Sequence, residues 1–123
     1  MPANLESRFD RLQLFVPEGD RASKAIPVDL HDRWVVRLLS LCGDLFGGAT
    51  SYGRGVGVWK SGRGKLWDRV TVVEVWAKRD VPDREKKMER LERRLREMGR
   101  ALRQEAVAFA INEYLVFLSA RSS

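Results

Sequence analysis

Glu74 is the residue whose type and setting come nearest to chemistry, because it is a carboxylate inside an apolar strand pattern. The segment 68–78 reads Asp-Arg-Val-Thr-Val-Val-Glu-Val-Trp-Ala-Lys, and its alternation predicts a β-strand with one buried face. A carboxyl among apolar neighbours can serve as a general acid or base. The same carboxylate can instead pair with an arginine on a neighbouring strand, and we favour that structural role.

A second candidate is the loop Lys60-Ser-Gly-Arg-Gly-Lys65. Its glycines let backbone N–H groups approach a phosphate, and the cations Lys60, Arg63 and Lys65 surround them. The loop is not a Walker A motif, because the Gly-Lys-Ser/Thr ending is missing. The sequence leaves two interpretations open, a phosphate-binding turn and a solvated hairpin.

The single histidine, His31, and the single cysteine, Cys42, exclude a Cys/His zinc cluster and an internal disulfide. His31 lies between Asp29 and Asp32, but neighbours in sequence rarely orient one another as a catalytic triad requires. We interpret His31 as an ordinary residue in the first turn of a helix, and Cys42 as a buried apolar residue of that helix. We expect no metal and no cofactor.

The chain is basic, with 23 Lys and Arg residues against 17 Asp and Glu residues and a net charge of +6. Segment 54–69 holds five basic residues against one acidic, and segment 84–103 holds nine against four. Basic surfaces of this kind are typical of proteins that bind a phosphate backbone, although mixed Arg and Glu also occur on solvated helices. The predicted phosphate contacts are Lys60, Arg63, Lys65, Arg90, Arg94 and Arg103.

A length of 123 residues predicts one domain spanning 1–123, with an ordered core over about 11–118. Runs of alternating or β-branched residues predict strands, and a helix is predicted to begin after Asp29 and to end at Gly47-Gly48. The four predicted strands are 11–16, 50–59, 68–78 and 113–118.

A second helix is predicted to start near Pro82 and to continue through Phe109. Its apolar residues recur every three or four positions, namely Met88, Leu91, Leu95, Met98, Leu102, Ala106 and Phe109. Gly99 inside this helix indicates a break or a close packing contact, since glycine costs about 1 kcal/mol relative to alanine in a helix.

The predicted order of elements is β-α-β-β-α-β. Two amphipathic helices can cover only one face of a four-stranded antiparallel sheet. We therefore predict an α+β fold of the ferredoxin-like sandwich type, with strand order 4-1-3-2 and both helices on one face.

The other face of that sheet is left uncovered and carries aromatic side chains. The side chains that fall on it are Gln13, Phe15, Val72, Glu74 and Trp76. Trp59 and Tyr114 join them in some registers of the sheet. Three partners remain open: a second copy, a small ligand enclosed by a dimer, and stacked RNA bases. We favour the homodimer, because most soluble oligomers are symmetric dimers. Stacked bases fit less well, because segment 70–77 lacks the basic-glycine-aromatic signature of RNA-recognition modules.

Three short motifs resemble a family of small bacterial domains of unknown function. They are Phe46-Gly-Gly-Ala-Thr50, Gly57-Val-Trp59 and Arg103-Gln-Glu-Ala-Val107. The resemblance implies the same βαββαβ fold and no activity. The residues that it singles out are Thr50, Trp59, Gln104 and Glu105, for which a purely structural role, such as capping or tethering a helix, is the alternative.

The function predicted from these patterns is a small basic binding module, homodimeric and associated with nucleic acid. The sequence leaves open whether the protein is an enzyme, and we favour a protein without catalytic activity. The first alternative is a dimeric α/β-barrel that binds a ligand or transfers a proton with Glu74. The second is a non-catalytic module that binds another protein. The sequence shows neither a signal peptide nor an apolar run long enough to cross a bilayer, so we expect a cytoplasmic protein without a membrane partner.

Overall fold

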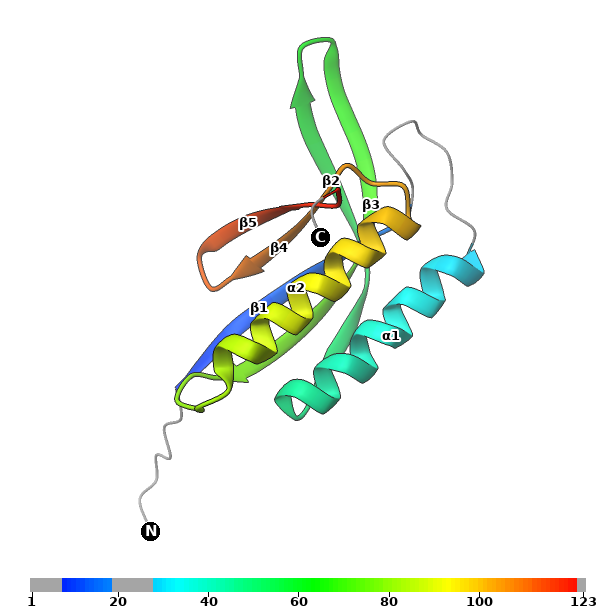
Figure 1. Ribbon diagram of the computed structural model, residues 1–123. Helices are drawn as coiled ribbons and strands as arrows, with labels where there is room; N and C mark the ends of the chain where they lie inside the picture. Colours follow the sequence, from blue (N-terminus) through cyan, green and yellow to red (C-terminus); the bar gives the residue numbers. More distant parts are fainter. Residues whose placement is uncertain (1–7, 19–27, 122–123) are drawn as a thin grey trace.

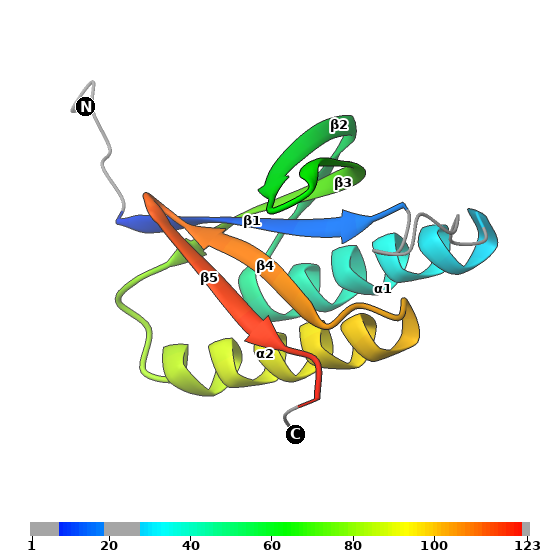
Figure 2. The same cartoon turned by 90° about the horizontal axis from the view of Figure 1, so that it is seen from above.

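The computed structural model describes residues 8–18 and 28–121, which form a five-stranded antiparallel sheet and two helices (Figure 1). The elements are β1 (Phe9–Pro17), α1 (Val28–Phe46), β2 (Thr50–Ser61), β3 (Gly64–Lys78), α2 (Arg84–Ala101), β4 (Ala106–Ile111) and β5 (Tyr114–Ser119). The strand order is β2-β3-β1-β4-β5. Both helices lie on the same face of the sheet (Figure 2), so the predicted α+β class and one-sided helix layer are confirmed.

The core lies between this sheet face and the helices. Leu12, Leu14 and Val16 of β1 are fully buried, and so are Val73 and Val75 of β3. They alternate with partly exposed residues, because successive side chains of a strand point to opposite faces. The sequence therefore predicted correctly which face the helices cover.

Helix α1 presents one apolar stripe to the sheet, which includes Trp34, Leu38 and Cys42, all buried. Burial raises the pKa of the Cys42 thiol to about 12, so that the residue behaves as a small apolar side chain, as predicted. The helix ends at Phe46, and Gly47 follows with a φ of 92°, a left-handed conformation that glycine adopts without strain.

Helix α2 is shorter than predicted, which changes the sheet. It ends at Ala101, and the residues from Ala106 to Ile111 form β4 instead of a further helical turn. Strand β4 lies between β1 and β5, and β5 is the strand predicted over 113–118. The predicted count of four strands is therefore wrong, and so is the placement of 113–118 next to the first strand.

The cause is the conformation of Arg103, which has a φ of 60°. The N–H of Gln104 donates to the carbonyl of Gly99 at 2.7 Å, and the N–H of Arg103 donates to that of Arg100 at 3.2 Å. This pair of bonds is a Schellman motif, which usually has glycine where this chain has Arg103. Without a glycine signal, the apolar residues beyond Leu102 extended the helical pattern, whereas Val107 and Phe109 are buried with a strand period of two.

Gly99 allows α2 to pack closely against the sheet. A Cβ atom at this position would lie 2.7 Å from Val107 Cγ2 and 2.8 Å from Ala120 Cβ. Arg100 donates a hydrogen bond to the carbonyl of Ala120 at 2.9 Å beside this contact. Of the two predicted explanations for Gly99, close packing is therefore correct.

His31 lies in the first turn of α1, as predicted, but it is not an ordinary surface residue of that turn. It is buried, and its Nε2 lies 3.0 Å from Thr71 Oγ1 of β3 while its Nδ1 lies 2.9 Å from Asp32 Oδ1. The imidazole ties α1 to the central sheet. The three side chains are arranged like a catalytic triad, but Thr71 lies in the helix–sheet interface, so we assign them a structural role.

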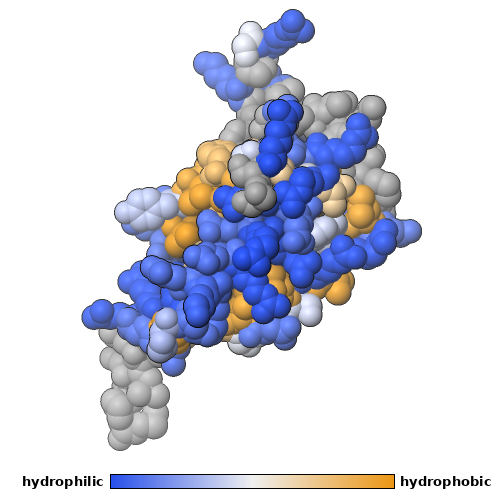
Figure 3. Space-filling view, in the orientation of Figure 1, coloured by the Kyte–Doolittle hydropathy of each residue, from blue (hydrophilic) through white to orange (hydrophobic). Residues whose placement is uncertain are grey.

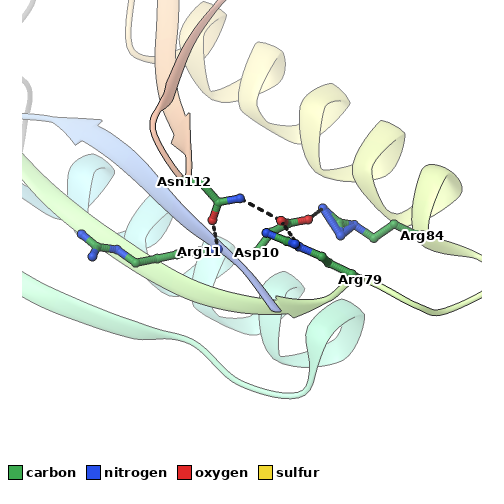
Figure 4. Close-up of polar contacts among 5 residues, drawn as sticks. All are labelled: Asp10, Arg11, Arg79, Arg84 and Asn112. Carbon is green, nitrogen blue, oxygen red and sulfur yellow. Dashed lines mark hydrogen bonds and ion pairs between the residues drawn. The ribbon is translucent and has the colours of Figure 1, made fainter. Parts of the chain in front are cut away.

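Asp10 joins four segments of the chain at one end of the sheet (Figure 4). Arg79 and Asn112 donate to its Oδ1 at 2.7 and 2.8 Å, and Arg84 donates to its Oδ2 at 2.6 Å. Asn112 also accepts a hydrogen bond from the N–H of Arg11 at 2.9 Å and adopts a φ of 52°, which asparagine tolerates. Asp10 thus connects the start of β1, the end of β3, the start of α2 and the β4–β5 turn.

None of the described helices is long and apolar enough to cross a membrane. The cytoplasmic location stays a prediction.

We expect replacement of glycine by alanine to have opposite effects on stability at Gly99 and at Gly43. Gly99→Ala forces Val107 and Ala120 to move and should lower the free energy of unfolding by about 1–3 kcal/mol. Gly43→Ala in α1 should raise it by about 0.5–1 kcal/mol, because a Cβ there meets nothing within 4 Å. Urea unfolding followed by circular dichroism measures both, and a stabilised Gly99→Ala variant would contradict the close contact.

We expect the folded protein to lose stability in acid, because Asp10 becomes protonated there. Burial by itself raises the pKa of Asp10, but the hydrogen bonds from Asn112 and Arg79 and the charges of Arg84 and Arg79 outweigh it, so its pKa lies below 3.8. Because the folded pKa is lowered, the stabilisation is complete above the ordinary carboxyl pKa and is lost as the pH falls through the folded value.

Asp10→Asn should therefore lower the free energy of unfolding by about 1–3 kcal/mol at neutral pH. The difference from the unsubstituted protein should shrink below the carboxyl's ordinary pKa of 3.8. Urea unfolding at a series of pH values measures it. A difference that stays constant into acid would show that the carboxylate charge is not what stabilises this junction.

Candidate functional site

The uncovered face of the sheet holds the candidate site. Val72, Glu74 and Trp76 of β3 lie on the side of the sheet away from the helices, as predicted, together with Gln13 and Phe15 of β1. Trp76 is 53% exposed. Aromatic surface that remains open to solvent on a folded sheet is typical of a binding face.

Glu74 is held by two neighbours on this face. Tyr52 Oη donates to Glu74 Oε1 at 3.0 Å, and Arg11 Nε lies 3.2 Å from Glu74 Oε2. Only 13% of the Glu74 side chain is exposed. The two contacts, one at each oxygen, hold the carboxylate in a fixed orientation. The predicted pairing of Glu74 with an arginine across the sheet is confirmed.

The register of the sheet explains this arrangement. Glu74 lies directly opposite Gln13 of β1 and Thr50 of β2. Arg11 and Tyr52 each lie two residues from those partners, which makes them diagonal neighbours of Glu74 on the same face. Long side chains bridge this diagonal distance readily.

The hydrogen bond changes the acidity of Tyr52. Donation to Glu74, followed by the negative charge of Glu74, raises the pKa of Tyr52 above 10.0. Tyr52 is therefore a protonated donor and not a base at neutral pH. Both Glu74 oxygens are engaged, by Tyr52 and by Arg11.

A shallow, open pocket of about 350 Å³ lies beside Glu74. Its lining consists of Phe46, Gly47, Gly48, Ala49, Thr50, Glu74 and Trp76. The loop from Phe46 to Thr50 joins the end of α1 to the start of β2 (Figure 1), and Gly47 and Gly48 add no side chain to that wall. The pocket combines an oriented carboxylate, an aromatic ring and exposed backbone.

The other residues predicted for the uncovered face are placed differently. Tyr114 pairs with Ile111, and this register puts it in line with the helix-facing side chains of β4, so its predicted place on the uncovered face is wrong. Trp59 belongs to β2, but its side chain lies outside the part of the structure that is described.

Of the residues singled out by the family resemblance, Thr50 lines the pocket. Gln104 and Glu105 lie instead in the turn between α2 and β4. Gln104 Nε2 donates to the carbonyl of Leu102 at 3.1 Å, and the carbonyl of Glu105 accepts from the N–H of Ala120 at 3.0 Å. Their contacts are those of the structural alternative, which tethers the end of the helix.

The predicted phosphate-binding cations are spread over separate elements. Lys60, Arg63 and Lys65 occupy the tip of the β2–β3 hairpin, which projects beyond the body (Figure 1). Arg90 and Arg94 lie along α2, where hydrophilic side chains cover most of the surface (Figure 3), and Arg94 pairs with Glu97 at 3.1 Å. Arg103 ends α2. Lys60 and Lys65 line an open hollow with Val58 and Gly64.

Sequence reasoning missed Arg11, Tyr52 and the loop from Phe46 to Ala49 as parts of the site. Tyr52 reaches the carboxylate because Thr50 pairs with Glu74, a register that the sequence did not define. No local pattern indicated that the end of α1 would lie beside Trp76. Among the described residues, no group of three His, Cys, Asp or Glu side chains could hold a metal ion.

No protein-family model and no curated protein matches the chain. The chain is similar to the solved structure of a phage SAM lyase in complex with S-methyl-5′-thioadenosine, with a TM-score of 0.66, 13% sequence identity and coverage of 100% of this chain and 98% of that chain. The apo state of a phage SAM lyase is similar with a TM-score of 0.59, 15% identity and coverage of 98% and 99%. At these identities the likeness establishes the fold.

These comparisons overturn the prediction of a nucleic-acid-binding module. Two solved chains that share this fold over nearly their whole length are those of a phage SAM lyase, an enzyme. The ion pair of Arg94 and the helix-ending role of Arg103 also show structural uses for residues predicted to bind phosphate. The resemblance to the family of small bacterial domains stays a prediction.

The Tyr52–Glu74 hydrogen bond predicts a measurable shift in tyrosine ionisation. In Glu74→Gln the charge is gone, and the pKa of Tyr52 should fall toward 10.0. Absorbance of tyrosinate as a function of pH measures it, with Tyr52→Phe assigning the remaining signal to Tyr114, the other tyrosine of the chain. Glu89→Gln on α2 is the control and should leave the titration of Tyr52 unchanged. If Glu74→Gln also leaves that titration unchanged, the contact between Tyr52 and Glu74 is contradicted.

Proposed function

We propose that this protein binds S-adenosylmethionine (SAM) at the Glu74 pocket and cleaves it to release S-methyl-5′-thioadenosine. Two findings support the proposal. The fold is that of chains described as a phage SAM lyase, one of them in complex with S-methyl-5′-thioadenosine. The pocket on the uncovered face combines the groups that such a ligand requires.

The oriented carboxylate of Glu74 beside Trp76 is the observation that carries the proposal. SAM has two cationic groups, the sulfonium and the ammonium, and an adenine ring. A carboxylate held in place by Tyr52 and Arg11 attracts a cation without having to reorganise. The Trp76 ring supplies a flat surface on which an adenine can stack or a sulfonium can rest through a cation–π contact.

The bond changes are simple to balance. The electron pair of the broken carbon–sulfur bond moves to sulfur, which turns the sulfonium into the neutral thioether of S-methyl-5′-thioadenosine. The carbon that loses sulfur is attacked by the carboxylate of the same SAM molecule, which yields a lactone and uses no water and no external base. This route suits the pocket, because both oxygens of its carboxylate, Glu74, are already engaged.

In this proposal Glu74 and Trp76 bind and orient the substrate, while Tyr52 and Arg11 are positioning residues for Glu74. The reaction removes two opposite charges, because the sulfonium becomes a neutral thioether and the carboxylate becomes an ester, while the ammonium is unchanged. An apolar setting around these two groups favours the step, because their neutral forms need less solvation than the charged pair. The rings of Trp76 and Phe46 provide such a setting at the pocket wall.

We also infer that strands β1 to β4 with both helices form a ferredoxin-like core. In that assignment β4 takes the position given to the fourth strand in the predicted order 4-1-3-2, and β5 is an addition at its edge. The support is the observed neighbour relation of β2, β3, β1 and β4.

The test is conversion of SAM by the purified chain, with S-methyl-5′-thioadenosine and the lactone quantified by liquid chromatography and mass spectrometry. Glu74→Gln should lower kcat/KM by roughly 10- to 100-fold, the equivalent of one hydrogen bond to a charged group. Trp76→Ala should act mainly on KM, since the ring binds substrate before and during the reaction alike.

Glu89→Gln on the exposed surface of α2 is the matched control and should leave the activity unchanged. Binding of SAM is measured independently by calorimetry. A folded protein that neither binds SAM nor forms S-methyl-5′-thioadenosine would overturn the proposal, as would full activity in Glu74→Gln.

A further inference from the structure

Arg11 lies beside the Glu74 pocket with part of its guanidinium open to solvent. It is directly opposite Trp76 of β3 on the uncovered face, and its Nε lies 3.2 Å from Glu74 Oε2. The side chain is 47% exposed, and within residues 8–18 and 28–121 it makes no other hydrogen bond or ion pair. Figure 4 shows the guanidinium pointing away from Asp10. Because a guanidinium carries five N–H donors, the Nη groups of Arg11 are available to a ligand.

The sheet places Arg11 on the other side of Trp76 from the pocket loop. Strand β3 lies between β1 and β2, and the residues that precede Thr50 of β2 line the pocket on the β2 side of Trp76. Neighbouring strands are about 4.8 Å apart, so roughly 10 Å separates β1 from β2. A small extended molecule that enters the pocket beside this loop can therefore cross Trp76 and Glu74 and reach Arg11.

The geometry points to Arg11 as the residue that binds the α-carboxylate of SAM, while Glu74 beside it binds the α-ammonium. This inference rests on the proposed function. The ammonium and the carboxylate of an α-amino acid are attached to the same carbon, and Glu74 and Arg11 present the complementary charges side by side. Two parallel N–H donors of a guanidinium also match the two oxygens of a carboxylate in geometry. Arg11 thus has a second role besides positioning Glu74.

Lys78 is a further cation on the uncovered face and the competing candidate for the carboxylate. It lies on β3 two residues beyond Trp76, and therefore four residues from Glu74. Two charges on the same carbon of a ligand require binding groups that lie next to each other. Arg11 contacts Glu74 and meets this requirement, whereas Lys78 lies too far along the strand.

The contact with Arg11 also orients the nucleophile of the proposed reaction. The carboxylate oxygen that stays with the guanidinium becomes the carbonyl oxygen of the lactone, and the second oxygen attacks the carbon that loses sulfur. Arg11 neither gives nor takes a proton in this step. Holding a reacting group in the geometry of attack is a large part of what an enzyme contributes to such a step.

A matched pair of ligands tests the proposal on the full chain by calorimetry. S-adenosylhomocysteine and its decarboxylated counterpart differ only in the carboxylate, and neither can be cleaved by the proposed reaction because their sulfur is a neutral thioether. The unsubstituted protein should bind S-adenosylhomocysteine at least tenfold more tightly. Arg11→Gln should weaken that ligand by roughly 10- to 100-fold, as expected for the loss of charged hydrogen bonds, and should change the affinity of the decarboxylated ligand much less.

Four variants separate this role from the others. Tyr52→Phe removes only a positioning contact of Glu74 and should weaken both ligands alike, so that the preference for the carboxylate remains. Lys78→Gln, and Arg93→Gln on the exposed surface of α2, should leave the preference unchanged. Arg11→Lys keeps the charge without the planar donor pair and should retain an intermediate preference. Circular dichroism checks that each variant is folded.

The inference would be overturned by a chain that shows no preference for the carboxylate, by a preference that survives Arg11→Gln, or by one that disappears in Lys78→Gln. If the chain still cleaves SAM in any of these cases, the proposed function stands and only the role of Arg11 is refuted. A folded chain that neither binds nor cleaves SAM overturns both.

Discussion

One-sided burial of the central strand pair is the constraint on which the rest of this protein depends. Strands β1 and β3 pair over nine residues, and every second side chain of β1 from Leu12 to Val16 is fully buried under the helices. Shifting this register by one residue would expose that entire set of apolar side chains. The register is therefore strongly specified, and the direction of each side chain on the opposite face follows from it.

The same register determines which side chains meet on the opposite, uncovered face. Gln13 and Glu74 face each other because Leu14 and Val73 face each other beneath the sheet. The diagonal positions then bring Arg11 and Tyr52 to the Glu74 carboxylate. A polar group that is oriented by rigid strands needs little reorganisation when a ligand binds, which is what a binding or catalytic site requires.

The large number of basic residues in the chain says little about its function. Arg11, Arg79 and Arg84 are engaged with the carboxylates of Glu74 and Asp10, where they determine the geometry of the sheet and its junctions. Arg100 bonds a backbone carbonyl beside the Gly99 contact. The net charge counts these engaged arginines together with the exposed cations. It therefore describes solubility and long-range attraction, and it does not identify the ligand of a site.

From the sequence alone, the alternation of β1 and β3, the apolar stripe of α1, the burial of Cys42 and the outward placement of Glu74 and Trp76 could all be predicted. These features are local, because side-chain direction repeats every two residues in a strand and about every 3.6 in a helix.

Only the tertiary structure decided where α2 ends, that β4 separates β1 from β5, and that the loop from Phe46 to Thr50 forms a pocket with Glu74. It also joined His31 to Thr71 and Asp10 to Asn112. No glycine follows α2 at Arg103 to indicate where the helix ends. The other features bring together residues that are far apart in sequence. Such contacts depend on how the elements pack, which no local pattern of residue types contains.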